Sequence, residues 1–284
     1  MPASSGIRPP AVAGSFYPAS ASVLAREVDQ FLAACPAPAP SGAVQAVLAP
    51  HAGYRYSGAI AARAFASAVP RAAIDTVVLV GPSHVEAFDF TSVFEGDAFA
   101  TPLGVVAVDT GLARALLARG GSLRLSSRGH LSGGGRGEHA LEVMLPFIQR
   151  TLPAARIVPV TMGSQSRAAC VALADSLAAH VDFARTLIVA SSDLSHFRRY
   201  DEAVRLDTAF CQLVSGGDGE ALLAGLTDGR CEACGGGPTA AVMLACARAR
   251  GTSAHVLARI NSGDVTGERD SVVGYAAAAF AEAS

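Results

Sequence analysis

Apolar positions along the chain follow two alternating patterns. Short runs rich in Val, Ile and Leu are separated by longer segments rich in Ala and Leu, in which apolar residues recur at the helical period. This alternation is typical of an α/β protein, in which the strands of a sheet are connected through helices. Strands are predicted at Ala46–Leu48, Thr76–Val80, Val105–Val108, Arg156–Val160, Leu187–Ala190, Val256–Ile260 and Ser271–Ala276. Helices are predicted at Ser22–Ala34, Gly58–Val69, Leu112–Arg119, His139–Thr151, Ala168–His180, Asp201–Val214, Gly219–Ala224 and Thr239–Arg250.

The connecting segments indicate a single domain spanning residues 1–284. Pro36–Gly42 is rich in Pro and Ala, and Arg128–Gly137 is rich in glycine, so both are expected to be loops. Neither loop divides the chain into halves of different composition, and no repeat with a period of about 20 to 50 residues is present. The glycine-rich stretch lacks the G-K-[ST] ending of a phosphate-binding loop, which argues against nucleotide binding there.

Histidines follow three of the predicted strands. His51 comes after the run AVLAP, His84 after VVLVGPS, and Asp193 and His196 after LIVASS. In an open α/β sheet the ligand crevice lies beyond the carboxyl ends of the strands, so these side chains converge if the strands are neighbours. One histidine at a strand end is more often structural. Three at equivalent positions favour a shared function.

Cys234 is the best candidate for a third metal ligand beside His51 and His84. Neutral imidazole is a common ligand of Zn, Fe and Cu, and two imidazoles need a further donor to hold a metal firmly. Cys234 precedes three glycines and Pro238, where a helix is expected to begin, and a thiol near a helix N-terminus and a cation is expected to have a lowered pKa. Alternatively, the pair C-x-x-C formed with Cys231 belongs to a zinc site or a redox pair, although no second C-x-x-C accompanies it.

Two further pairs are candidates for acid–base chemistry. Asp193 and His196 are three residues apart, so the carboxylate is expected to orient the imidazole as a general base. The structural alternative is that Asp193 caps the chain after its strand and His196 lies on the surface. His139 and Glu142 are also three apart and could face the same pocket from a helix, and here the functional and structural interpretations stand equally.

Bulk composition excludes several classes of function. Apolar residues make up 51% of the chain and charged residues 16%, which is a globular composition, and the formal net charge is −2. Without a basic block, neither nucleic acid nor an anionic membrane is an expected partner. The chain shows no secretory signal pattern and no apolar run of about 18 residues, so a cytoplasmic protein is expected. Its six scattered cysteines do not suggest a disulfide framework.

Several motifs along the chain make it similar to the Memo family, whose bacterial and archaeal members are called AmmeMemoRadiSam system protein B. The motifs are AVAGSFYPA (Ala11–Ala19), LAPHAGYRYSG (Leu48–Gly58), VGPSH (Val80–His84), TPLG (Thr101–Gly104), EHALEVMLPF (Glu138–Phe147), SSDLSH (Ser191–His196), CGGGP (Cys234–Pro238) and NSGDVTGERDSVVGYAA (Asn261–Ala277). They occur in order over nearly the whole chain, so chance does not explain the match.

The resemblance implies a fold like that of class III extradiol dioxygenases, with a central mixed sheet flanked by helices. It implies His51, His84 and Cys234 as metal ligands, with His196 and Asp193 as catalytic neighbours. The dioxygenases have an acidic residue where this chain has the cysteine, and a thiolate changes the redox properties of the site. Many relatives carry a polar residue, often His, where this chain has Met144, so one possible donor is missing.

Two hypotheses from different classes follow. The first is a mononuclear non-haem iron enzyme of oxygenase or redox type, with copper or zinc as alternative metals and His196 moving a proton. The second is a non-catalytic protein that binds iron or copper, or a peptide, in a dioxygenase-like pocket. The family name implies AMMECR-domain and radical-SAM proteins as pathway partners. A Ser–His–Asp hydrolase using Ser192 or Ser195 is a weaker third idea, because no G-x-S-x-G motif is present.

Overall fold

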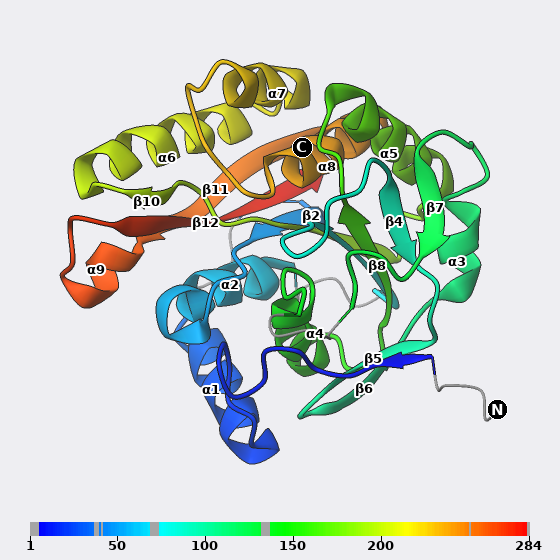
Figure 1. Cartoon of the computed structure of the whole chain (residues 1–284), viewed down its shortest axis with the longest axis horizontal. Helices are drawn as coiled ribbons and strands as arrows, with labels where there is room; N and C mark the ends of the chain where they lie inside the picture. Colours follow the sequence, from blue (N-terminus) through cyan, green and yellow to red (C-terminus); the bar gives the residue numbers. More distant parts are fainter. Residues whose placement is uncertain are drawn as a thin grey trace.

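The computed structural model describes residues 6–36, 40, 42–68, 74–131, 137–249 and 251–282. Its centre is a nine-stranded mixed sheet (Figure 1). In spatial order the strands are β10 (His196–Arg198), β12 (Val272–Glu282), β2 (Val44–Ala49), β9 (Thr186–Ser191), β3 (Thr76–Pro82), β8 (Arg156–Met162), β4 (Thr91–Phe94) and β7 (Leu123–Ser126), with β11 (Thr252–Asn261) paired to β12.

The middle of the sheet is parallel. β2, β9, β3 and β8 are neighbours that all run in one direction, and nearly every residue in them is buried. Strands covered on both faces are expected to be continuous apolar runs, which is how these four were recognised in the sequence. Antiparallel pairs lie on both sides of this centre: β12 pairs with β2, and β4 pairs with β8.

Helices cover both faces of the sheet and bury two hydrophobic layers (Figure 1). Alternate residues of one strand face opposite layers: Leu48, for example, belongs to one and Val47 to the other. The first layer includes residues of α3 (Thr110–Ala115), α5 (Arg167–His180), α6 (Tyr200–Ser215), α7 (Gly219–Thr227) and α8 (Gly236–Ala249). The second includes residues of α1 (Ala21–Ala33), α2 (Tyr54–Ala68) and α4 (Leu145–Thr151). The predicted fold class, α/β with a central mixed sheet flanked by helices, is confirmed.

The N-terminal segment joins a second, smaller sheet. β1 (Ile7–Arg8) pairs in parallel with β5 (Ala98–Thr101), which forms an antiparallel pair with β6 (Gly104–Ala107). Of these three, only β6 was predicted. The others are short, and β1 has only two residues, too few for an alternating pattern to be recognised.

All seven predicted strands are present, with bounds that differ by a few residues. β12 extends beyond the predicted Ala276 to Glu282, because its alanines alternate between the two buried layers. The helix predicted over His139–Thr151 is wrong in its first turn: a 3₁₀ segment, η1 (Glu142–Met144), precedes α4. α9 (Ser262–Thr266), β4, β7 and β10 were not predicted.

Four predicted segments extend beyond the described residues. Val69 and Arg250, at the ends of two predicted helices, lie outside them, as do 132–136 of the glycine-rich loop and 37–39 and 41 of the Pro/Ala-rich loop. Among the residues that the structure describes, no helix combines the length and apolar character needed to cross a lipid bilayer.

Candidate metal centre

The carboxyl ends of three adjacent parallel strands meet at one edge of the sheet. β9 lies between β2 and β3 and pairs with both. His51 lies two residues beyond β2, His84 two beyond β3, and Asp193 two beyond β9. The three strands are therefore neighbours, which is the condition on which the predicted convergence of the three side chains depends.

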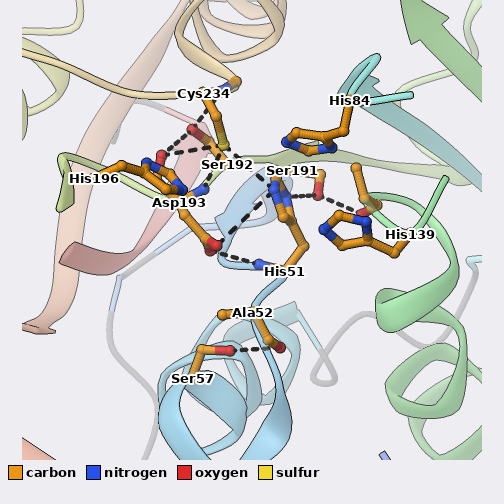
Figure 2. A network of polar contacts seen from close by, with 12 residues as sticks. His51, Ala52, Ser57, His84, His139, Ser191, Ser192, Asp193, His196 and Cys234 are labelled. Carbon is orange, nitrogen blue, oxygen red and sulfur yellow. Dashed lines mark hydrogen bonds and ion pairs between the residues drawn. The ribbon is translucent and has the colours of Figure 1, made fainter. Parts of the chain in front are cut away.

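The described residues contain one group of His, Cys, Asp or Glu side chains close enough to share a metal ion, and it consists of three histidines. One ring nitrogen from each of His51, His84 and His139 lies within 4.8 Å of the other two. The ring centroids of His51 and His84 are 5.0 Å apart, and those of His84 and His139 are 4.7 Å apart. Figure 2 shows the other two rings beside His51, with Cys234, Asp193 and His196 on its opposite side.

His51 is held with one nitrogen free. The hydroxyl of Ser191 donates its single proton to the carbonyl of Ala140 at 2.6 Å. Nδ1 of His51 lies 2.8 Å from that hydroxyl oxygen, so Nδ1–H must be the donor in this contact. We therefore assign the lone pair of the neutral ring to Nε2, which is the atom that a metal would bind.

His84 is oriented in the same way by a carboxylate. Its Nδ1 lies 3.0 Å from Oε1 of Glu138, and its backbone N–H donates to Oε2 at 2.5 Å. Burial opposes the charge of Glu138, but the hydrogen bonds and charge of His84 and the backbone N–H of Ala140 outweigh it and lower the pKa of Glu138 to about 2. An ionised carboxylate can only accept, so Nδ1 of His84 donates to it, and Nε2 is the nitrogen left for a metal ion.

His139 is the third nitrogen donor, and its role could not be settled from the sequence. It lies on the turn before η1, where its ring contacts that of Phe16 with centroids 4.7 Å apart. Burial and the neighbouring His84 lower its pKa to about 4, while burial lowers that of His51 well below its ordinary value. Both rings are therefore neutral near pH 7, as metal binding requires.

Cys234 lies beside His51, as the sequence predicted. Its Sγ is 3.3 Å from Nε2 of His51 and accepts the backbone N–H of Asp193 at 3.3 Å. The next residue, Gly235, permits this approach, since a Cβ there would come within 2.1 Å of the carbonyl oxygen of Ser191. Cys234 is outside the group of three histidines but touches one of them. Its role as a ligand stays a prediction.

Without a cation beside it, the Cys234 thiol does not have the lowered pKa expected for a thiol next to both a helix N-terminus and a cation. Burial, together with the nearby charge of Asp193, raises the pKa of this thiol well above its ordinary value. Position near the start of α8 is not enough to offset that burial. In the absence of a cation, Cys234 is therefore a neutral thiol near pH 7.

Asp193 and His196 are both at the site, but the carboxylate does not orient that imidazole. Nδ1 of His196 donates to the carbonyl of Leu194 at 2.8 Å, which leaves its Nε2 as an acceptor. Asp193 accepts the backbone N–H of His51 at 2.8 Å instead, and its other carboxylate oxygen lies 4.0 Å from Nε2 of His51. Burial raises the pKa of Asp193 to about 7, and burial lowers that of His196.

The segment leading to His196 is anchored by a buried acid that no sequence motif singles out. Asp207, on α6, accepts the backbone N–H of Ser195 at 3.1 Å. Burial raises the pKa of Asp207 to about 6. Gly274 is required opposite it, because a Cβ there would lie 2.0 Å from the carboxylate. Asp207 thus fixes the backbone next to His196 without facing the histidine cluster.

The other two residues considered at this site point elsewhere. Glu142 does not face the histidines; its carboxylate contacts the N-terminal segment. Met144 is fully buried in the hydrophobic layer that also contains α4. A cavity of about 460 Å³ adjoins the site, lined by Cys234 and His196 together with leucines that include Leu223 and Leu226.

The residues present fit a metal ion. Two of the three clustered histidines are held through Nδ1 by a hydrogen-bond partner, which leaves Nε2 for a metal ion, and this arrangement is found around protein-bound metals. Imidazole nitrogens with a neighbouring thiol suit iron, copper or zinc rather than Mg²⁺ or Ca²⁺. The fold and this cluster together define an α/β protein with a candidate metal centre at the carboxyl ends of its central strands.

The chain belongs to the Memo family: the family model described as Memo-like protein matches residues 8–279. A MEMO1 family protein of Methanothermobacter thermautotrophicus is 35% identical over 278 residues, which cover 95% of this chain and 99% of that one. Another, of Aeropyrum pernix, is 35% identical over 95% of this chain and 98% of that one. The solved structure of an uncharacterized protein from Escherichia coli K12 matches with a TM-score of 0.48 and 14% identity, covering 82% of this chain and 98% of that one.

Proposed function

We propose that this protein is a mononuclear non-haem iron enzyme of redox or oxygenase type. The observation that carries the proposal is the cluster of His51, His84 and His139, with ligand nitrogens within 4.8 Å of one another and Cys234 in contact with His51. Three or four such donors leave coordination positions for a substrate. We further propose that Cys234, as thiolate, is a ligand together with His51 and His84, and that His139 lies at the same ion.

The bound metal would supply Lewis-acid and one-electron redox chemistry. The chain's own residues would accept and donate the protons of the reaction. His196 presents Nε2 as a base that is neutral near pH 7, because burial lowers its pKa. Asp193, whose pKa burial raises to about 7, can hold or release a proton in the same range. The cavity beside Cys234 and His196 gives a small molecule access to both groups.

A non-catalytic role is the second candidate, and the Cys234 thiol favours it. A thiolate is a soft donor that stabilises copper or iron, and it takes a position that a substrate would otherwise use. In this role the protein would sequester a metal ion, or bind a peptide, without turnover.

Oxygen consumption separates the two roles. The protein is loaded anaerobically with Fe²⁺, and oxygen uptake is followed with a series of catechols. The enzyme proposal expects uptake that depends on substrate and is lost in His51→Ala. A fully loaded protein that consumes no oxygen with any of them would favour the binding role.

A further inference from the structure

A buried carboxylate ties the N-terminal segment to the metal centre. Glu142 is 1% exposed and accepts four hydrogen bonds, all from residues near the N-terminus. Arg8 Nη1 donates to it at 2.6 Å and the hydroxyl of Tyr17 at 2.6 Å. The backbone N–H groups of Ala11 and Val12 donate at 2.8 and 3.0 Å. The side chain of Glu142 is thereby fully used in holding this segment.

Arg8 also contacts the chain segment that precedes η1. Its guanidinium is buried, and besides Glu142 it donates to the backbone carbonyls of Glu138 and His130. The guanidinium carbon, Cζ, also lies 4.8 Å from the centroid of the Phe99 ring. Arg8 therefore contacts both ends of the turn formed by residues 138–142, which we call the histidine turn: it binds the backbone carbonyl of Glu138 and the side-chain carboxylate of Glu142.

The histidine turn contacts every histidine of the cluster. Glu138 orients His84 through Nδ1, and His139 is itself a member. The carbonyl of Ala140 accepts the proton of the Ser191 hydroxyl, which in turn fixes Nδ1 of His51. A displacement of this turn would thus change the orientation of all three rings together.

We propose that Arg8 and Glu142 are positioning residues of the metal centre, which hold the histidine turn so that His139, His84 and His51 present their nitrogens to one point. The inference rests on the metal site proposed above. A buried ion pair adds little net stability, because the cost of removing both charges from water offsets their attraction. The Arg8–Glu142 pair instead restricts the histidine turn to one conformation. The motif AVAGSFYPA helps to hold the turn as well, because its backbone N–H groups and the Tyr17 hydroxyl donate hydrogen bonds to Glu142.

The test compares the single variant Arg8→Met with the double variant Arg8→Met/Glu142→Gln. Arg8→Met leaves Glu142 as an unpaired buried charge, so this variant is expected to lose stability as well as affinity. The double variant Arg8→Met/Glu142→Gln carries no unpaired charge and is expected to fold more stably than Arg8→Met alone. Both are titrated with Co²⁺, whose visible absorption bands report the geometry of its ligands. We expect Co²⁺ binding at least tenfold weaker than wild type in both, with altered bands.

Two controls separate positioning from general destabilisation. Leu173→Ala, in the hydrophobic layer on the other face of the sheet, is expected to destabilise the fold and leave Co²⁺ affinity within twofold of wild type. In a His139→Ala background, Arg8→Met is still expected to weaken Co²⁺ binding, because the histidine turn also orients His84 and His51. Wild-type affinity in the double variant, or no effect of Arg8→Met without His139, would overturn the proposal.

A metal-free measurement keeps the inference distinct from the proposed function. Nitrogen NMR of the histidine rings is expected to show His51 and His84 of the wild type as single tautomers with Nδ1 protonated. In the double variant Arg8→Met/Glu142→Gln these rings are expected to become mixtures of tautomers. Unchanged tautomers there would refute positioning, whereas failure of the wild type to bind Co²⁺ would refute the metal site.

Discussion

Replacing Glu138 with Gln tests how far the metal centre depends on the groups behind its ligands. The carboxylate of Glu138 is nearly buried and accepts from Nδ1 and the backbone N–H of His84 and from the backbone N–H groups of His139 and Ala140. A Gln side chain keeps one acceptor oxygen and places an NH₂ group where the other was. At least one of the N–H groups that bind Glu138 then faces this NH₂ group, which is itself a donor. The preference of His84 for the Nδ1–H tautomer is lost.

The size of the effect follows from the structure in two ways. Partners behind metal-bound histidines typically contribute about 10- to 100-fold to metal affinity, so we expect a loss in that range. The carboxylate also stabilises the fold. A pKa of about 2 in place of 4.5 corresponds to up to about 3 kcal/mol at neutral pH. Because the folded-state pKa is the lower one, this contribution is complete above about pH 4.5 and disappears as the pH falls to about 2.

Two assays measure these quantities separately. Co²⁺ titration gives the affinity, and urea unfolding at pH 7 and pH 3 gives the stability. Glu220→Gln is the matched control, since that carboxylate is on the surface in an ion pair with Arg167. We expect Glu138→Gln alone to lose affinity, and its stability deficit to shrink at pH 3. An affinity within twofold of wild type, or a deficit that does not change with pH, would refute the role given to this carboxylate.

Three further substitutions have defined outcomes. Cys234→Ser is expected to reduce the metal content of the purified protein strongly without changing its unfolding midpoint, since the softest donor is lost; unchanged content would remove it as a ligand. His196→Ala is expected to keep the metal and to alter turnover or ligand binding only, whereas loss of metal would make His196 a ligand. Asp207 has a folded-state pKa raised to about 6 by burial, so its ionisation lowers wild-type stability by about 2–3 kcal/mol as the pH rises from 4 to 6. In Asp207→Asn the fall in stability over this range is expected to be smaller than in the wild type by that amount, while the share due to the raised pKa of Asp193 remains; an equal fall in both proteins would assign the effect to another group.

The sequence predicts those elements whose structure depends mainly on the pattern of their own residues. The four central strands are apolar throughout because helices cover both of their faces, and this leaves an unambiguous pattern. The places of His51, His84 and Asp193 follow directly, since each comes two residues after one of these strands. Their convergence was predictable on the condition that these strands are neighbours, and the structure supplies that condition.

The remaining features depend on contacts between distant segments. Whether His139 faces the site is decided by Glu142, whose partners Arg8 and Tyr17 are more than 120 residues away in the sequence. The raised pKa of Cys234 comes from burial, which its position before α8 does not reveal. Asp193 binds the backbone of His51 rather than the ring of His196, although His196 is closer in sequence.

We propose above all that the clustered histidines, with Cys234 beside them, hold one metal ion. The decisive experiment is elemental analysis of protein purified without added metal, with His51→Ala prepared in parallel. We expect about one equivalent of metal per chain in the wild type, chiefly iron, and much less in the variant. Wild-type protein that contains no transition metal and takes up none on exposure to Fe²⁺, Cu⁺ or Zn²⁺ would contradict it.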